Sequence, residues 1–245
     1  MKNVLCFQYY DSGNPNRQEE LNYVLQENLK LQFDDYFIFI HPDLDFPSDD
    51  QRITYISLQD RLKFSNFLEI VTCTDNQLLV LINSDIQLNE SLFSSTSYLQ
   101  IGMMFALTRY EKNGELAYSD NPRISQDTWI MKSQPLPQTL IDQSQIQLGI
   151  PGCENLFSGS MKSYGFEVFN PCLDIQTYHH HDSDYRTTAS SERYWGLYYE
   201  PEPCFLKDIS EGRPILKSTM RVLSASQGFI DVSLTPQSKS FLGAG

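Results

Sequence analysis

Apolar runs alternate with helically spaced apolar residues along the first half of the chain. The continuous runs predict strands at residues 4–10, 36–40, 52–56 and 78–82. Apolar residues three and four positions apart predict helices at residues 17–31 and 61–71. Strands that alternate with helices favour a mostly parallel sheet with helices on both of its faces. The pattern therefore predicts an α/β fold.

The second half of the chain is less regular. Further strands are predicted at residues 102–109, 128–131 and 166–169, and a short helix at residues 154–164. Mixed sheet and loops are therefore expected in this half. After about Thr187 the periodicity is lost, and Tyr, Ser and Pro are frequent. We expect one domain over residues 1–187 and an appended segment over residues 188–245 that packs on this domain or is partly flexible.

The composition indicates a folded, acidic protein. Of 245 residues, 40% are hydrophobic and 20% are charged, and the formal net charge is -13. This charge disfavours nonspecific binding to nucleic acid or to an anionic membrane surface. No run approaches the ~20 apolar residues that a membrane-spanning helix needs. The N-terminus resembles a first core strand more than a signal peptide. We expect no nucleic-acid partner and no membrane span.

The five cysteines are scattered along the chain and form no Cys-x-x-Cys pair. Cys6 and Cys73 lie among apolar residues. Buried free thiols in a reducing compartment are the expected state, which favours a cytoplasmic location. The spacing does not support a zinc ribbon.

The apolar run at residues 78–82 leads directly into Asn83-Ser84-Asp85. In open α/β sheets, ligands bind in the crevice outside the carboxyl ends of the strands. A carboxylate placed there suits Mg²⁺ or Mn²⁺ and, through the metal, a diphosphate. A strand end followed by an Asx turn would give the same pattern without a ligand.

Two further acidic residues lie at positions from which they could line a cleft. Asp127 comes immediately before the short apolar strand at residues 128–131, and Glu154 follows a Gly-Ile-Pro-Gly-Cys turn and opens a helix. Asp127 could line a cleft or belong to a capped turn. Glu154 could be a general base, or a capping residue that interacts with the helix dipole.

Histidine and arginine complete the set of candidate residues. His179 and His181 share one face if their segment is extended, and neutral imidazole is a common ligand for transition metals. A surface histidine cluster is the alternative. Arg61 and Lys63 are expected to open the helix that precedes the Asp85 strand, where an arginine could pair with a diphosphate or face solvent.

Six segments appear in a characteristic order along the chain. They are Arg61-Leu62-Lys63-Phe64-Ser65-Asn66-Phe67, Leu81-Ile82-Asn83-Ser84-Asp85-Ile86, Ala106-Leu107-Thr108-Arg109-Tyr110-Glu111, Ser125-Gln126-Asp127-Thr128-Trp129-Ile130, Leu148-Gly149-Ile150-Pro151-Gly152-Cys153-Glu154-Asn155, and Asn170-Pro171-Cys172-Leu173-Asp174-Ile175 leading to His179 and His181. Over about residues 4–186, this order resembles a family of bacterial and algal proteins related to nucleotide-sugar glycosyltransferases of the GT-A type.

The resemblance implies a Rossmann-like GT-A fold whose mostly parallel, mixed central sheet is flanked by helices. It also implies that Mn²⁺ or Mg²⁺ grips the diphosphate of a UDP- or GDP-sugar. The family's metal-binding Asp-x-Asp position falls on Asn83-Ser84-Asp85, so Asp85 alone carries the ionic contact. His179 or His181 matches a further metal ligand. This chain has Gly-Cys-Glu-Asn where family members usually have Gly-Cys-Asp-Asn.

The implied activity is transfer of a sugar to a hydroxyl of a glycan or another acceptor, with a weak preference for inversion. The metal and Arg61 would neutralise the leaving diphosphate, and Asn83 and Ser84 would also contact the donor nucleotide. Glu154 would deprotonate the acceptor. Asp127 would bind the donor sugar or acceptor, or replace Glu154 as the base. The base and ribose would meet Tyr9, Tyr10 and Asp11.

Three alternatives remain open from the sequence. A sugar nucleotidyltransferase shares the fold but usually has a Gly-rich basic loop after the first strand, whereas residues 11–16 contain one Gly and no Lys. A non-catalytic GT-A-like binding or scaffold domain would explain Asn83 but not the retained Asp85 and Glu154. An iron oxygenase that uses His179 and its neighbours needs a jelly roll, which the predicted helices oppose.

Overall fold

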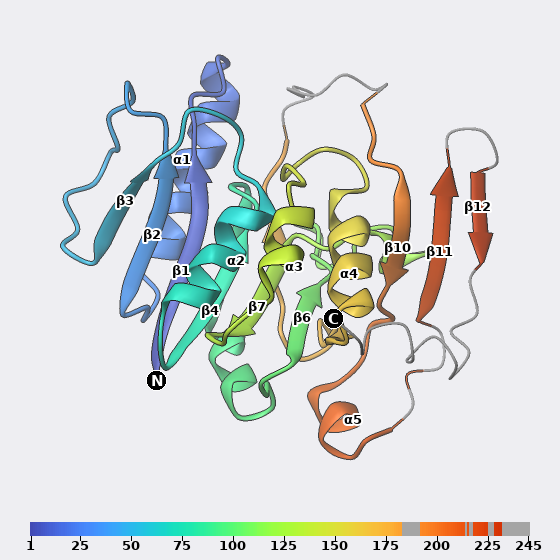
Figure 1. Cartoon of the computed structure of the whole chain (residues 1–245). Helices are drawn as coiled ribbons and strands as arrows, with labels where there is room; N and C mark the ends of the chain where they lie inside the picture. The colour runs from blue at the N-terminus through green and yellow to red at the C-terminus, as the bar shows by residue number, and fades with distance from the viewer. Residues whose placement is uncertain (183–191, 214, 216–217, 225–227, 232–245) are drawn as a thin grey trace.

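A computed structural model describes residues 1–182, 192–213, 215, 218–224 and 228–231 of the chain. Its centre is a seven-stranded sheet (Figure 1). The strand order is β3 (Ile53–Ser57), β2 (Asp35–Ile40), β1 (Lys2–Tyr9), β4 (Gln77–Ile82), β7 (Thr128–Lys132), β6 (Met103–Leu107) and β8 (Glu167–Phe169). Strand β7 is antiparallel to both of its neighbours, and the other strands are parallel. The predicted α/β class with a mostly parallel, mixed sheet is confirmed.

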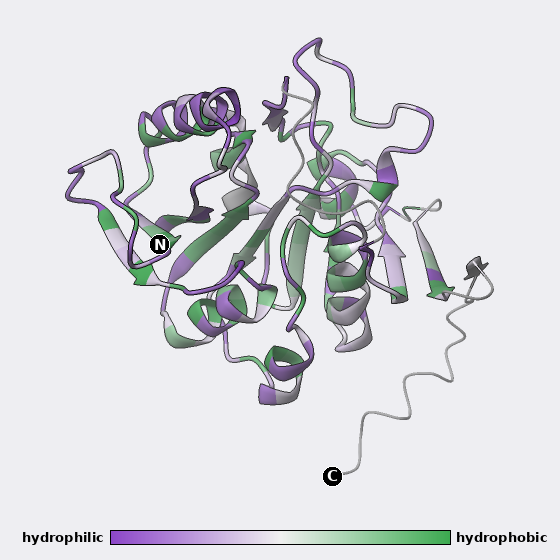
Figure 2. Cartoon of the chain, turned by 90° about the horizontal axis from the view of Figure 1, so that it is seen from above, coloured by the Kyte–Doolittle hydropathy of each residue, from purple (hydrophilic) through white to green (hydrophobic). Residues whose placement is uncertain are grey.

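Helices cover both faces of the central sheet (Figures 1 and 2). Helix α1 (Pro15–Leu29) lies on one face, and α2 (Phe64–Cys73), α3 (Gln138–Gln143) and α4 (Cys153–Ser163) lie on the other. Each strand sends alternate side chains into two cores, because successive residues of a strand point to opposite faces. In β1, Val4 and Cys6 join the core under α2 and α4, while Leu5 and Phe7 join the core under α1.

Aromatic packing fixes α2 and α4 on the sheet. The Phe64 ring stacks on Phe157 of α4 with centroids 3.9 Å apart and meets Trp129 of β7 edge-on at 4.7 Å. All three side chains are fully buried. Each buried aromatic side chain contributes a large apolar area, so this cluster holds the start of α4 against the carboxyl side of the sheet.

The first two helices begin at positions other than those predicted. Helix α1 begins at Pro15, because the Asn14 side chain caps it by accepting a hydrogen bond from the Arg17 backbone N–H at 3.1 Å. Helix α2 begins at Phe64, so Arg61 and Lys63 do not open it as expected. Lys63 is extended instead, because it pairs with Gln147 in a β-bridge, and the Leu62 carbonyl oxygen accepts from the Leu148 backbone N–H at 2.9 Å.

The region beyond Thr187 contains strands that its periodicity did not reveal. Strands β10 (Gly196–Glu200), β11 (Thr219–Ser224) and β12 (Gly228–Asp231) form a three-stranded antiparallel sheet, and α5 (Leu206–Ser210) lies between the first two. Strand β10 packs closely on α4: a Cβ atom at Gly159 would lie 2.0 Å from the Leu197 carbonyl oxygen. Parts of the segment expected at 188–245 lie outside the described residues.

Short elements connect the main layers. Strands β5 (Ile86–Gln87) and β9 (Tyr178–His179) pair antiparallel, and two 3₁₀ helices span Glu90–Ser97 and Pro122–Ile124. Strand β5 begins immediately after Asp85, so its pairing with β9 determines which residues stand beside that carboxylate. None of the helices in the described part of the chain is both long and apolar enough to cross a membrane.

Candidate functional site

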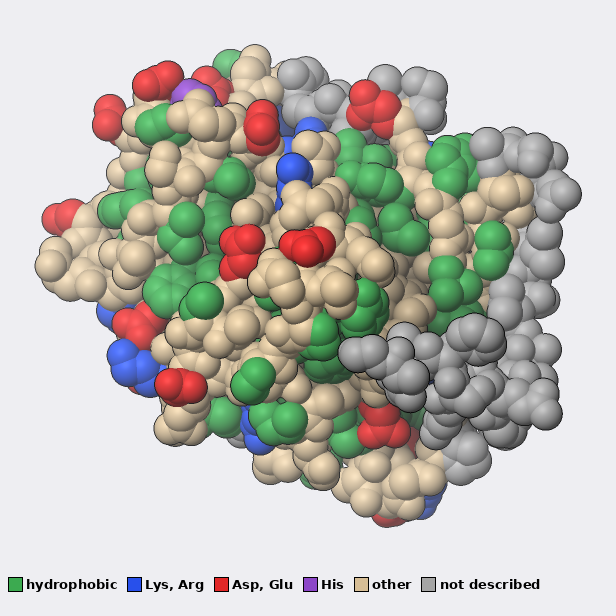
Figure 3. Space-filling view, in the orientation of Figure 1, with side chains coloured by type: hydrophobic (Ala, Val, Ile, Leu, Met, Phe, Trp, Pro, Cys, Tyr) green, Lys and Arg blue, Asp and Glu red, His purple; other side chains and the backbone are tan. Residues whose placement is uncertain are grey.

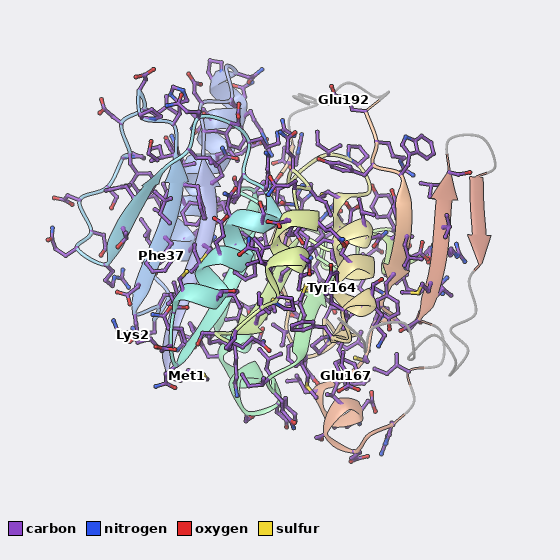
Figure 4. All side chains as sticks on the ribbon, in the orientation of Figure 1. Met1, Lys2, Phe37, Tyr164, Glu167 and Glu192 are labelled. Carbon is purple, nitrogen blue, oxygen red and sulfur yellow. The ribbon has the colours of Figure 1, made fainter. Side chains whose placement is uncertain are left out.

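One cleft collects all eleven side chains that the sequence singled out as site candidates. Its volume is about 1190 Å³, and it lies beyond the carboxyl ends of β1 and β4. Figure 4 places Glu192, one of its lining residues, at the end of the molecule opposite Met1 and Lys2. In Figure 3, a group of basic side chains lies in the upper middle of the visible face, close to acidic ones. The position is the one expected for a ligand site in an open α/β sheet.

Among the described residues, Asp85, His179 and His181 form a compact group of potential metal ligands in the cleft. Pairing of Ile86 with His179 in the β5–β9 ribbon brings the imidazole to the carboxylate. His179 Nε2 lies 3.3 Å and His181 Nδ1 lies 3.7 Å from Asp85 Oδ2. The three candidate ligand atoms lie within 4.8 Å of one another. The structure thus brings these three sequence candidates together, and their role as metal ligands stays a prediction.

The donor set fits a divalent transition-metal ion. Ligand atoms about 2.1 Å from an ion lie roughly 3 to 4 Å from one another. Each imidazole lies at such a distance from Asp85 Oδ2, at 3.3 and 3.7 Å. His179 also contacts Glu111 Oε2 through Nδ1 at 3.2 Å, which directs Nε2 toward Asp85. Such a carboxylate partner is usual for a metal-binding histidine. Two imidazoles with one carboxylate suit Mn²⁺ better than Mg²⁺, which prefers oxygen ligands.

Arg17 is a site residue that the sequence analysis missed. Its guanidinium is buried and lies 2.5 Å from Asp85 Oδ2, while Nη1 donates to Glu20 Oε2 at 2.8 Å and to the His180 carbonyl oxygen at 2.9 Å. Burial alone would raise the pKa of Asp85, but hydrogen bonds to His179 and His181 and the charge of Arg17 hold this pKa well below its usual value. Asp85 is therefore ionised at neutral pH.

Asn83 and Asp127 belong to a second network, next to the Asp85 cluster. Asn83 Nδ2 donates to Asp127 Oδ1 at 2.6 Å, and Arg109 Nη1 donates to Asp127 Oδ2 at 2.7 Å. Ser125 Oγ also lies 3.2 Å from Asp127 Oδ2. Arg109 is the second site residue that the sequence analysis missed. Unlike Arg17, it lies in one of the six ordered segments, so the sequence did contain a signal for it. Asn83 thus positions Asp127 and is not a further member of the candidate metal-ligand group around Asp85.

Ser84 is tied to the first strand. Its Oγ donates to the Gln8 carbonyl oxygen at 2.6 Å, which fixes the turn between β4 and Asp85 against β1. The side chains of Asn83 and Ser84 therefore both have protein partners, although both line the cleft. Their predicted contacts with a nucleotide stay a prediction.

Glu154 lies in the first turn of α4, and Gly152 makes its position possible. Gly152 adopts the left-handed conformation at φ +84°, and a Cβ atom there would lie 1.9 Å from the Tyr198 hydroxyl. Only glycine accommodates both restrictions. Burial, with the charge of Asp127 adding to it, raises the pKa of Glu154 to about 7. A carboxyl group with this pKa can accept a proton and release it again near neutral pH.

The remaining candidates line the cleft around the ends of β1 and α2. The Tyr9 hydroxyl donates to Asn22 at 3.1 Å, and the Asp11 carboxylate accepts from the Gly13 backbone N–H at 2.8 Å. Tyr10 is half-buried, the charges of Asp85 and Arg17 act on it, and burial raises its pKa. Arg61 lines the same cleft, and its Nη1 donates to the Leu148 carbonyl oxygen at 3.4 Å.

The comparison with known proteins supports the fold assignment and does not identify the chemistry of the site. No protein-family model matches the chain, and no curated protein matches its sequence. Among solved structures, it is similar to the mannosyltransferase PcManGT from Pyrobaculum calidifontis in complex with GDP-Man and Mn²⁺, with a TM-score of 0.51 and 9% identity. That similarity covers 75% of this chain and 58% of that one, so this chain spans little more than half the length of that protein.

Two further structures are similar at lower scores. One is a Desulfovibrio desulfuricans protein assigned as a nucleotide-diphospho-sugar transferase (TM-score 0.47, 15% identity, 77% of this chain and 88% of that chain). The other is 2-C-methyl-D-erythritol 4-phosphate cytidylyltransferase from Francisella tularensis (TM-score 0.42, 8% identity, 77% and 95%). The strand order and the mannosyltransferase similarity together show that this chain has a Rossmann-like, GT-A-like fold.

Proposed function

We propose that this protein is a metal-assisted glycosyltransferase that moves a sugar from a nucleoside-diphosphate sugar to an acceptor hydroxyl. The observation that carries the proposal is the combination, in one cleft, of the Asp85–His179–His181 cluster with Glu154, a carboxyl group whose pKa is about 7. A metal-ligand group suits a diphosphate, and a poised carboxyl group suits a hydroxyl nucleophile. The mannosyltransferase of similar fold, solved with GDP-Man and Mn²⁺, is consistent with this donor class.

The donor half of the cleft lies between β1 and Asp85. Tyr9, Tyr10 and Asp11 stand at the carboxyl end of β1, where they would meet the base and ribose. Asp85, His179 and His181 would hold the divalent ion, Mn²⁺ before Mg²⁺. Such an ion supplies Lewis-acid stabilisation of the negative charge that develops on the departing diphosphate. Arg61, which lines the cleft and whose charge acts on Tyr10, would contribute a further positive charge.

The reaction needs one proton acceptor and one leaving group. Glu154 would take the proton of the acceptor hydroxyl as its oxygen bonds to the anomeric carbon. The bond from that carbon to the diphosphate oxygen breaks, and the electron pair leaves with the nucleoside diphosphate. Asp127 already accepts from Asn83 and Arg109, so we assign it to orient the sugar and keep it as the alternative base. A single base on the acceptor side favours inversion.

Product analysis tests this function. The full chain is incubated with UDP- and GDP-sugars, Mn²⁺ and a panel of glycoside acceptors, and the nucleotide products are separated. We expect release of UDP or GDP with a new glycoside, and Glu154→Gln should lower that rate by about 10²-fold or more. Glu69→Gln, which changes an exposed glutamate on α2, is the matched control. Products of pyrophosphorolysis, or no consumption of any donor, would contradict the proposal.

A further inference from the structure

Glu111 contacts both networks of the cleft, although it is not one of the described residues that line it. Its Oε2 lies 3.2 Å from His179 Nδ1, and its Oε1 accepts from Arg109 Nε at 3.3 Å. The two partners belong to different groups, because His179 is one of the candidate metal ligands and Arg109 donates to Asp127. One carboxylate therefore lies between the two parts of the site.

Both sequence neighbours of Glu111 are tied to the segment that carries the histidines. The Tyr110 carbonyl oxygen accepts a hydrogen bond from the His179 backbone N–H at 2.8 Å. The ammonium group of Lys112 forms an ion pair with Asp182. These contacts hold the two segments side by side. The Glu111 carboxylate is therefore directed to the His179 ring by its own backbone surroundings.

The Glu111 carboxylate determines which ring nitrogen of His179 carries the proton. A carboxylate only accepts hydrogen bonds, so the proton of a neutral His179 lies on Nδ1, which faces Glu111. The other nitrogen, Nε2, then has a free electron pair, and this is the atom 3.3 Å from Asp85 Oδ2. Only an unprotonated ring nitrogen can bind a metal ion. Glu111 thus keeps Nε2 available as a ligand atom.

The Arg109 guanidinium connects Glu111 to Asp127. A guanidinium is planar and presents its N–H groups in a fixed fork, so the positions of its partners depend on one another. Its Nε donates to Glu111, while its Nη1 donates to Asp127 Oδ2 at 2.7 Å. Asp127 also accepts from Asn83, which lies two residues before Asp85. The contacts form a closed ring of six residues, namely Asp85, His179, Glu111, Arg109, Asp127 and Asn83.

We propose that Glu111 is a positioning residue that links binding of the metal ion to the orientation of Asp127. The link runs through the His179 ring on one side and through the Arg109 guanidinium on the other. Glu111 itself touches neither the ion nor the sugar. The inference rests on the proposed function, which places the ion and Asp127 in one reaction. Because linkage is reciprocal, a change at Arg109 should alter the affinity for the ion.

Replacing Glu111 by its isostere tests the histidine side of the link. In Glu111→Gln the amide oxygen accepts from Arg109, so the amide N–H₂ faces Nδ1 of His179 and the ring proton moves to Nε2. Affinity of the full chain for Mn²⁺, measured by electron paramagnetic resonance with and without UDP or GDP, should fall about tenfold or more. Glu111→Ala imposes no tautomer and should lose less. Glu115→Gln, an exposed acid of the same turn, is the matched control and should bind Mn²⁺ like the wild type.

A double-mutant cycle tests the arginine side of the link. Arg109→Lys keeps the charge but cannot make the forked contact, so Mn²⁺ affinity should fall about threefold or more. Adding Arg109→Lys to Glu111→Ala should cause no further loss. The Glu111 side chain is 41% exposed, so its variants should fold.

The outcomes separate the link from the proposed function. If Mn²⁺ does not bind the wild type under either condition, the metal site of the proposed function fails, and the link fails with it. If Mn²⁺ binds the wild type but Glu111→Gln binds it at least as tightly as Glu111→Ala, or if the losses from Arg109→Lys and Glu111→Ala add, the link alone is wrong. A purely structural role of Glu111 would make the alanine variant the weaker binder.

Discussion

The guanidinium of Arg17 lies 2.5 Å from Oδ2 of Asp85, although the two residues are 68 positions apart in sequence. The same oxygen faces both imidazoles of the candidate metal site. A buried arginine keeps its charge at any physiological pH. The carboxylate that we assign to the metal is therefore already paired with a fixed cation, and a divalent ion would bind beside a like charge.

Arg17→Gln should consequently strengthen binding of Mn²⁺ in the absence of nucleotide. Two like charges near 4 Å apart repel by up to about 4 kcal/mol in a partly buried site, and Glu20 offsets much of this, so we expect a gain of about tenfold. Electron paramagnetic resonance of free Mn²⁺ measures the affinity directly. Arg17→Lys keeps the charge and should resemble the wild type. Weaker Mn²⁺ binding in Arg17→Gln would mean that Arg17 organises the metal ligands instead of competing with the ion.

Glu154 should make the stability of the folded protein depend on pH. Its pKa is about 7 in the folded state, against an ordinary value of 4.5. Below pH 4.5 the group is protonated in both the folded and the unfolded chain. As the pH rises to 7 only the unfolded chain releases the proton, so stability is lost, by about 3 kcal/mol above pH 7 at roughly 1.4 kcal/mol per pH unit.

Glu154→Gln removes this titration, so the variant should gain on the wild type as the pH rises. Urea denaturation at pH 4.5 and pH 8, followed by tryptophan fluorescence, gives the free energy of unfolding of each protein. The difference between variant and wild type should shift by about 3 kcal/mol in favour of the variant at pH 8. A difference that stays constant between the two pH values would show that Glu154 is not protonated in the folded state near neutral pH.

Because Gly152 lies against the Tyr198 hydroxyl, adding one methyl group at residue 152 should greatly lower the free energy of unfolding. Gly152→Ala combines a left-handed backbone with a Cβ atom 1.9 Å from the Tyr198 hydroxyl, so it should destabilise the protein by about 3 kcal/mol or more. Gly165→Ala is the matched control, since its φ is +88° but nothing lies within 4 Å of the added atom. It should cost only about 1 kcal/mol. Equal losses of unfolding free energy in the two variants would show that α4 and β10 are not packed as described.

Much of the fold could be predicted because its strands are nearly continuous apolar runs. The run at residues 78–82, for example, is buried on both faces of the sheet in β4. Strand β10 could not be recognised in this way, because its apolar run is short and ends at Glu200, an acid that is fully buried. Periodicity detects the burial of apolar residues and does not detect a buried acid.

The sequence pointed to those residues of the cleft that follow strands or belong to the six ordered segments and the histidines after them. Asp85 comes just after β4, and ligands of open α/β sheets bind beyond the carboxyl ends of the strands, so its place in the site could be predicted. Arg17 lies on a helix face, and its contacts with Asp85 and the His180 carbonyl oxygen join positions that are remote in sequence. The sequence also does not show why Asn83 stands where an acid was expected. In the structure its side chain donates a hydrogen bond to Asp127.

Asn83→Asp should therefore fail to improve metal binding. The new carboxylate would face Asp127 across the 2.6 Å contact that the amide now makes, and two carboxylates at that distance repel. We expect Mn²⁺ affinity within about threefold of the wild type and a loss of about 1–3 kcal/mol in stability. Calorimetric titration and urea denaturation give the two quantities. A clear gain in Mn²⁺ affinity would place residue 83 among the metal ligands.

The central claim is that Asp85 joins a divalent ion to a nucleoside diphosphate, and calorimetric titration of UDP and GDP tests it most directly. Wild-type protein should bind one of the two nucleotides at least about tenfold more tightly with Mn²⁺ than with EDTA. Asp85→Asn should abolish that difference, whereas Asp75→Asn, an exposed acid just before β4, should retain it. Equal affinity with Mn²⁺ and with EDTA in the wild type, or an unchanged Mn²⁺ effect in Asp85→Asn, would contradict the account.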